Sequence, residues 1–187
     1  MSTELRKLQV DLEEVALHMG NDFEMADMLG YFDTETGEAE LFDRANIQII
    51  EGIYEEYRDI DSDEPLDLDG ILREQGYHDW ECEVLLRVEQ FYLAPSTRYV
   101  ELPEQDSRAG YQDMEDFIEM VDDHRLRNRL ERAIAGRGPF RRFKDVLMTN
   151  GYVEKQWFAF RDEREQGRVR EWLLSIGIDA VNTRAKQ

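Results

Sequence analysis

The sequence predicts an α+β fold over residues 1–187, with a small antiparallel β element near the N-terminus and a predominantly helical C-terminal half. Before residue 43, short segments of alternating apolar and polar residues flank a turn, whereas from residue 107 onward apolar residues recur every three or four positions. The 187 residues are enough to bury roughly 70% of the surface that the unfolded chain exposes. We therefore expect a single acidic domain with three regions: a helix and hairpin (1–42), an acidic insertion-like segment (43–97), and a strand and helical region (98–187).

The N-terminal region is expected to hold a helix followed by a β-hairpin. In residues 4–19 the apolar side chains are three or four positions apart, as on one face of an amphipathic helix, and Gly20 follows. Residues 25–32 are short and apolar-rich, and residues 38–42 alternate with period two. Gly37 lies in the turn between them and can take a positive φ, so we expect these two segments to pair.

The middle of the chain has weaker patterns. Residues 46–57 fit either a helix or a strand, and their length favours the helix. Residues 77–95 are poorly defined, although the part from 82 to 91 is compatible with a helix. Residues 98–103 end in a proline and have the composition of a short strand, which we expect to join the hairpin.

An acidic loop is expected at residues 59–69, where Asp67 or Asp69 can cap a short helix that stops at Gly76. The loop is a candidate for weak cation binding through five aspartates: Asp59, Asp61, Asp63, Asp67 and Asp69. It does not fit a calcium loop, because Glu64 stands where that loop needs glycine and Gly70 where it needs a bidentate glutamate. We predict no specific metal site, and a plain solvated loop remains the alternative.

The C-terminal half is expected to form three or four helices. A first helix over residues 107–121 follows the capping candidates Asp106 and Ser107. A second helix ends at Gly136, a third begins at Pro139, and a long last helix closes near Gly177. Beyond it, residues 182–187 are expected to be frayed.

Side-chain positions within these helices follow from the same spacing. We expect three aromatic residues of the last helix to be largely buried: Trp157, Phe160 and Trp172. Asp113 and Asp116 are placed on faces other than the apolar stripe of the first helix. Three arginines of the last helix are expected to form ion pairs within that helix: Arg161, Arg164 and Arg168.

Charge is unevenly divided along the chain. The net charge is -20, and residues 1–123 carry -27 whereas residues 124–187 carry +7. In one interpretation the basic helices complement the acidic part within one fold. In the other, at least one of the two surfaces is presented to a partner.

The composition also bears on compartment and cofactors. The single cysteine, Cys82, cannot form an internal disulfide or a cysteine-based metal site. The first twelve residues carry charges where a signal peptide needs an apolar core, and the chain has no apolar stretch of about 20 residues. We expect a cytoplasmic protein that has no cofactor and does not bind membranes.

Four segments resemble an uncharacterised protein family of bacteria, one of the numbered families of unknown function. These segments are 31–38 (YFDTETGE), 98–103 (RYVELP), 136–145 (GRGPFRRFKD) and 157–164 (WFAFRDER). The resemblance covers roughly the first forty residues and then residue 98 to the end, and it leaves out residues 43–96. It implies a bacterial cytoplasmic protein with a small β element and a helical C-terminal half, and it supplies no reaction, cofactor or catalytic residue.

Catalytic constellations are hard to find in the sequence. The chain has three histidines, none in a nucleophile-elbow context, and it has no phosphate-binding loop. His78 and Cys82 could share a helix face, but the acidic residues between them would raise the cysteine pKa rather than lower it. We name no catalytic residue.

The most distinctive chemistry is a basic cluster that is interleaved with Phe140 and Phe143. Its members are Arg137, Arg141, Arg142 and Lys144. Guanidinium groups near a helix N-terminus suit a phosphate or carboxylate, so the cluster is a candidate anion- or partner-binding site. In the alternative interpretation the phenylalanines are core and the arginines pair with the acidic half, or with Asp145 and Glu131.

Together these observations favour a non-enzymatic protein-binding or regulatory module with segregated acidic and basic surfaces. Its protein partner is not identified by the sequence. A nucleic-acid-associated protein that uses the basic cluster is one alternative, and an acidic mimic of nucleic acid is another. A metal-dependent hydrolase is the enzymatic alternative.

Overall fold

The computed structural model describes residues 5–19, 27–57, 65–104 and 106–183. The chain forms two compact units. The sheet unit is Asn21–Pro103, and the helical unit combines Met1–Gly20 with Glu104–Gln187. The predicted α+β class with a helical C-terminal half is confirmed, whereas the single-domain organisation stays a prediction.

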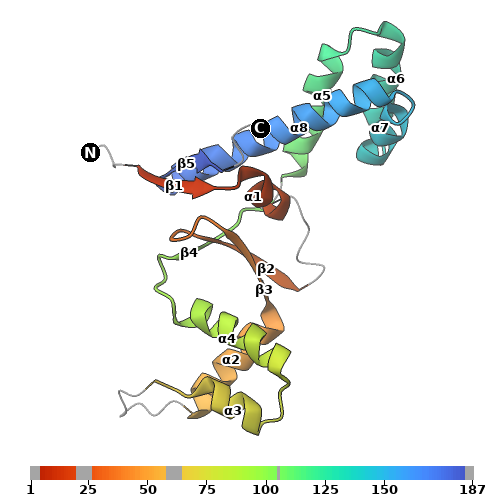
Figure 1. Ribbon diagram of the computed structural model, residues 1–187. Helices are drawn as coiled ribbons and strands as arrows, with labels where there is room; N and C mark the ends of the chain where they lie inside the picture. The colour runs from red at the N-terminus through yellow and green to blue at the C-terminus, as the bar shows by residue number, and fades with distance from the viewer. Residues whose placement is uncertain (1–4, 20–26, 58–64, 105, 184–187) are drawn as a thin grey trace. The chain divides into compact units, whose positions relative to one another are not determined.

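The sheet unit contains the predicted hairpin and third strand (Figure 1). Strands β2 (Met28–Asp33) and β3 (Ala39–Asp43) pair antiparallel, and β4 (Tyr99–Glu101) pairs antiparallel with the other edge of β2. Gly37 lies in the hairpin turn with a φ of 83°, which a residue with a Cβ rarely adopts. The turn and the period-two alternation were therefore sufficient signals for this sheet.

Helices complete the sheet unit. They are α2 (Arg44–Tyr57), α3 (Leu68–Glu74) and α4 (Asp79–Leu93), so the ambiguous segment 46–57 is a helix and α4 is longer than the compatible stretch 82–91. Phe91 of α4 stacks on Phe42 of β3 with ring centroids 4.3 Å apart. This aromatic contact joins the helices to the sheet in one buried cluster.

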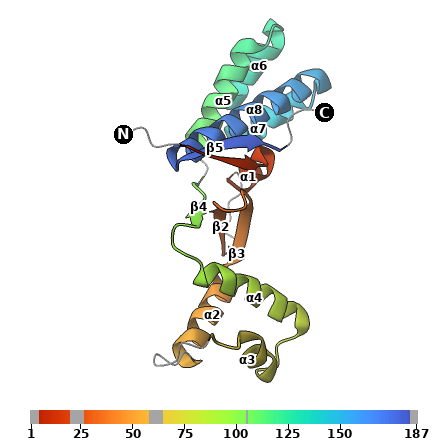
Figure 2. The same cartoon turned by 60° about the vertical axis from the view of Figure 1, so that its left-hand side comes forward.

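The helical unit contains the predicted C-terminal helices (Figure 2). They are α5 (Ser107–Met120), α6 (His124–Ile134), α7 (Pro139–Leu147) and α8 (Gly151–Ser175). The Asp106 side chain accepts the N–H of Arg108, and Pro139 lies in the first turn of α7. The apolar stripes of all four helices meet in one core, which includes Phe117, Leu130 and Phe143.

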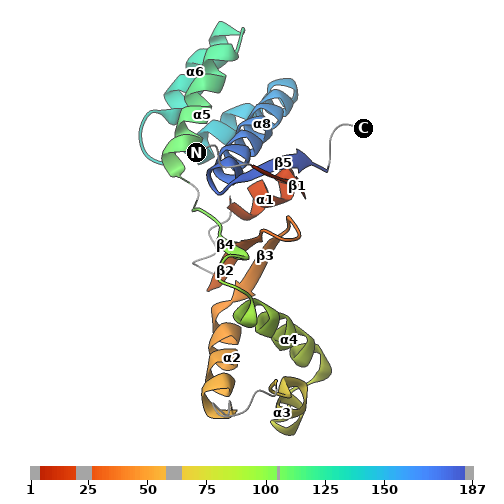
Figure 3. The same cartoon turned by 90° about the vertical axis from the view of Figure 1, so that its left-hand side faces the viewer.

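The structure corrects the predicted N-terminal helix. Only its second half is helical, as α1 (Leu12–Met19), while β1 (Arg6–Val10) is a strand. β1 pairs in parallel with β5 (Ile178–Asn182), in the register Arg6↔Ile178 to Val10↔Asn182 (Figure 3). The expected fraying is therefore wrong for residue 182, while residues 184–187 lie outside the described residues.

Burial of the aromatic residues in α8 is lower than predicted. Trp157, Phe160 and Trp172 are each partly buried rather than buried. Trp157 still contributes to the core, because its ring lies 4.8 Å from that of Phe143. In the part of the chain that the structure describes, no helix combines the length and the apolarity that crossing a bilayer would need.

Candidate functional site

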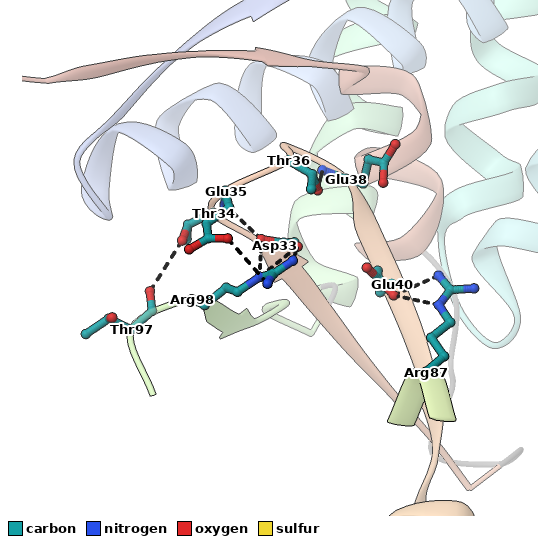
Figure 4. Close-up of polar contacts among 9 residues, drawn as sticks. All are labelled: Asp33, Thr34, Glu35, Thr36, Glu38, Glu40, Arg87, Thr97 and Arg98. Carbon is teal, nitrogen blue, oxygen red and sulfur yellow. Dashed lines mark hydrogen bonds and ion pairs between the residues drawn. The ribbon is translucent and has the colours of Figure 1, made fainter. Parts of the chain in front are cut away.

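Two arginine–carboxylate pairs hold the sheet unit together (Figure 4). Arg98, just before β4, donates from Nε and Nη2 to Oδ2 of Asp33 at 3.1 and 2.7 Å. Asp33 ends β2, and its side chain is 1% exposed. On the neighbouring strand, Glu40 accepts from Nε and Nη2 of Arg87 at 3.0 and 2.7 Å. The segments 31–38 and 98–103 are therefore joined directly by an ion pair.

The environment of Asp33 keeps its carboxylate ionised. Burial alone would raise its pKa, but hydrogen bonds from Arg98 and from the backbone N–H groups of Glu35 and Thr36 outweigh burial and lower that pKa. A carboxylate that is ionised and saturated with donors is a poor general acid or base. We therefore assign Asp33 and Arg98 to the fold rather than to chemistry.

A second buried carboxylate lies between α5 and α8. Asp113, whose side chain is 2% exposed, accepts from Arg164 Nε at 3.0 Å and lies 2.9 Å from Arg168 Nη2. Arg164 also bonds Asp116 at 2.7 Å. The prediction that Arg164 and Arg168 form ion pairs within α8 is wrong, because their carboxylate partners lie on α5. Asp113 was also expected on a face away from the apolar stripe, and it is buried. Arg161 does pair within α8, with Asp162 at 3.1 Å and with Glu165 at 3.5 Å.

The basic cluster belongs to a larger basic surface on α6, α7 and the loop between them. Residues 124–147 contain eight basic and two acidic side chains, a net charge of +6. We call the eight the basic surface: Arg125, Arg127, Arg129, Arg132, Arg137, Arg141, Arg142 and Lys144. None of them forms an ion pair with another described residue of the helical unit, whereas seven of the ten other arginines that the structure describes form one. The alternative in which they pair with Asp145 or Glu131 is not seen among the described residues.

Two members of the basic surface are held by backbone carbonyls. Arg142 donates from Nη1 to Ala135 O and from Nη2 to Arg132 O, both at 2.9 Å, at the C-terminal end of α6. Arg127 donates from Nε and Nη2 to Val121 O, just after α5. These contacts satisfy carbonyls that a helix end leaves unpaired, and neither arginine forms an ion pair with a carboxylate of the helical unit within the described residues.

The remaining residues of the predicted cluster are accessible. Arg137, Arg141 and Lys144 are all exposed, so the structure brings them to the surface while Arg142 also has the capping role. The two phenylalanines of the cluster differ: Phe143 is core at 2% exposed, whereas Phe140 is 48% exposed. A shallow hollow of about 310 Å³ between α6 and α7 is lined by three arginines, Arg129, Arg132 and Arg142, together with Ala133, Asp145 and Val146.

A second hollow lies on the other face of α7. It has a volume of about 410 Å³ and is bounded by α5, α7 and α8. Its apolar lining consists of Met114, Phe140, Phe143, Leu147, Trp157 and Phe158. We call it the apolar hollow. Lys144 lines it as well and is thus shared with the basic surface.

The other predicted sites are placed differently. Asp59, Asp61 and Asp63 lie outside the described residues, so the cation-binding loop stays a prediction. Asp67 caps α3 by accepting the N–H of Gly70, and Asp69 pairs with Arg73 at 2.9 Å. Within the described ranges, no three His, Cys, Asp or Glu side chains come together as metal ligands would.

Cys82 and His78 lie at the start of α4. Cys82 is buried, with its Sγ 3.9 Å from the carbonyl oxygen of Tyr77. His78 is the N-cap residue of α4, and its backbone N–H donates to Glu81 at 2.8 Å. A burial of this kind suits a structural thiol rather than a nucleophile.

Comparison with known proteins identifies one family. The model of an uncharacterised protein family (UPF0158) matches residues 79–185, which is more than half of the chain. The matched range contains the segments 98–103, 136–145 and 157–164, whereas 31–38 lies outside it. It also includes residues 79–96, which the resemblance leaves out. No curated protein and no solved structure matches the chain.

Proposed function

The chain belongs to the uncharacterised protein family UPF0158, and we propose that it is a non-enzymatic protein-binding module whose basic surface takes an acidic segment of a partner protein. The observation that carries this proposal is the lack of ion-paired carboxylates around the eight basic residues within the described part of the helical unit. The helical unit itself contains 20 acidic and 18 basic residues, so its surface cations have acids available within the same unit. A basic surface that stays unpaired is therefore suited to an external anion.

The structure around α7 supports recognition of anionic groups. Arg142 is fixed by its two bonds to α6 carbonyls, so its charge is held in place before any partner arrives. Arg129 and Arg132, one turn apart on α6, line the same hollow. Guanidinium groups bind carboxylates and phosphates in a fork geometry, so Asp and Glu side chains are suitable occupants, and the choice between the two anions depends on charge.

Charge favours an acidic protein segment over nucleic acid. The sheet unit contains 23 acidic and 5 basic residues, a net charge of -18 in the same chain. DNA carries one negative charge per about 1.7 Å of duplex, so a long polyanion is repelled by the chain as a whole. A short acidic segment presents few charges and can approach the basic surface locally. The proposal includes a location in the bacterial cytoplasm, as the family resemblance implies.

The proposal is tested with defined anions and the full chain. Fluorescence anisotropy would measure binding of a short labelled glutamate peptide and of a longer RNA oligonucleotide that carries several times its charge, across a salt series. The test variant replaces four exposed arginines with glutamine: Arg129, Arg132, Arg137 and Arg141. The control variant makes the same charge change at four exposed residues elsewhere in the helical unit: Arg6, Lys7, Arg108 and Lys155.

We expect the glutamate peptide to bind with an affinity that falls as the salt concentration rises. This affinity should fall by at least about tenfold in the test variant and stay unchanged in the control variant. At ~0.15 M salt we expect no binding of RNA by the full chain, because the Debye length of ~8 Å still lets nearby acids oppose a polyanion. Tight RNA binding that the four substitutions abolish would replace the protein partner with nucleic acid. Equal loss in the control variant would show that only net charge matters and would overturn the proposal.

A further inference from the structure

The apolar hollow lies beside the basic surface on a single helix. Four side chains of α7 line the hollow and have the i, i+3, i+4 and i+7 spacing of one helix face: Phe140, Phe143, Lys144 and Leu147. Arg142 and Asp145 lie on the opposite side, where they line the basic hollow against α6. A partner segment that lies across α7 would therefore meet positive charge and an apolar recess within one helix diameter, about 10 Å.

The hollow has the size and lining of a binding site for a large apolar side chain. Its volume of about 410 Å³ falls within the range of small-molecule pockets. Phe140 and Phe158 on its rim are 48% and 36% exposed, an uncommon exposure for phenylalanine that a bound apolar group would reduce. Between Glu154 and Glu165 of α8 the hollow extends about 16 Å, at 1.5 Å per residue.

Charges around the hollow define how an acidic segment can lie. Asp113 is neutralised by Arg164 and Arg168, and Glu165 lies 3.5 Å from Arg161. Glu154 and Asp106 form no ion pair within the described part of the chain, whereas Lys144 on α7 supplies positive charge to the same recess. An acidic segment is thus attracted along the α7 side and repelled near Glu154 and Asp106.

From this placement we infer that the partner segment is amphipathic, with an apolar, preferably aromatic, residue that enters the apolar hollow while its acidic residues contact the basic surface. The inference rests on the proposed function, because it names the chemistry of the segment bound there. Charge complementarity along α7 selects this occupant over a neutral ligand. The aromatic residue supplies affinity by burial, and the acidic residues supply orientation.

The experiment uses the full chain and two acidic synthetic peptides of equal length and charge. One peptide has a central tryptophan and the other has alanine at that position. Gly110→Leu is the blocking variant, because a Cβ at Gly110 would lie 3.2 Å from Phe140 Cε1, inside the hollow. Gly167→Leu is the matched control, because a Cβ at Gly167 on α8 meets no atom within 4 Å. Phe158→Ala is a second variant that removes one wall, and thermal unfolding checks that every variant is folded.

We expect the tryptophan peptide to bind about tenfold more tightly than the alanine peptide. This preference should disappear in Gly110→Leu, fall in Phe158→Ala, and persist in Gly167→Leu. Equal binding of both peptides would overturn this inference and leave the proposed function standing, whereas binding of neither would overturn both. A tryptophan preference that survives Gly110→Leu and Phe158→Ala would place the aromatic residue elsewhere and would also overturn the inference.

Discussion

Arg98 binds the buried carboxylate of Asp33 through two nitrogens and so joins two segments that are 65 positions apart in the sequence. Asp33 also accepts the N–H of Glu35, which fixes the hairpin turn, while Thr34 donates its backbone N–H to the carbonyl of Arg98. The pair therefore connects the turn, β2 and β4. Its position explains why the third strand joins the hairpin although helices α2 to α4 intervene.

Asp33→Asn should lower the free energy of unfolding by about 3 kcal/mol at pH 7, because it removes one partner of a buried ion pair. Glu35→Gln is the control: Glu35 lies 3.3 Å from Arg98, but its side chain is 59% exposed, so we expect a loss below about 1 kcal/mol. Urea unfolding of the two variants measures both values. Equal losses would show that the buried Asp33 ion pair stabilises the protein no more than the exposed Glu35 contact.

The pH dependence of stability has a definite sign at Asp33. Because the pKa of Asp33 is lowered in the folded state, the pair stabilises the protein above the ordinary aspartate pKa of about 3.9, and this contribution is lost as pH falls below that value. Between pH 7 and pH 3, the free energy of unfolding should therefore fall less in the Asp33→Asn variant than in the parent protein. An unchanged acid profile would contradict the assignment.

Glu165 should behave in the opposite way. Burial raises its pKa, although Arg161 opposes the shift, so folding favours the protonated form. The folded state is then relatively more stable below the ordinary glutamate pKa and loses that contribution as pH rises through the raised value. Glu165→Gln should therefore flatten the stability profile between about pH 4 and pH 7. A variant with the same slope as the parent chain would be inconsistent with this view.

The ion pairs of the buried Asp113 should stabilise the protein more than the ion pair of the neighbouring, more exposed Asp116. Asp113→Asn leaves Arg164 and Arg168 without their buried partner and should cost about 3 kcal/mol. Asp116→Asn removes one contact of a side chain that is 36% exposed and should cost less than about 1 kcal/mol. The difference between the two unfolding free energies tests whether the buried carboxylate joins α5 to α8.

Alanine substitutions of the two phenylalanines of α7 should show that one lies in the core and the other at the surface. Phe143→Ala should cost ~3–5 kcal/mol, since the side chain is 2% exposed and packs on Trp157. Phe140→Ala should cost less than about 1 kcal/mol, because this side chain borders the apolar hollow and is half exposed. Similar losses would mean that Phe140 is also part of the core.

Local periodicity was enough to predict most of the fold. The hairpin has alternating residues and a glycine at its turn, and the C-terminal helices have apolar stripes with capping residues at their ends. β1 and β5 could not be predicted in this way, because a parallel pair between Arg6–Val10 and Ile178–Asn182 depends on contacts across almost the whole chain. Leu5, Leu8 and Leu12 also match helical spacing, so the local pattern alone pointed to the wrong structure.

The candidate site was only partly visible in the sequence. The run of arginines around Phe140 and Phe143 marks the basic surface by composition, but the capping role of Arg142 depends on where α6 ends. Asp113 carried no signal, because one acid on an amphipathic helix resembles a solvated residue until its partners, 51 and 55 positions away, are known. The apolar hollow is formed by three helices and has no local pattern.

The measurement that tests the central claim most directly is the site at which an acidic peptide becomes attached. A glutamate peptide with a blocked N-terminus, activated with a carbodiimide, forms an amide bond with a lysine that lies beside its bound carboxylates. Lys144 is the one lysine of the basic surface, whereas Lys7 and Lys155 lie elsewhere in the helical unit. We predict that mass spectrometry finds the peptide mainly on Lys144 and that an excess of unactivated glutamate peptide, present during the reaction, reduces this attachment. Equal attachment to Lys7, Lys144 and Lys155 would contradict it.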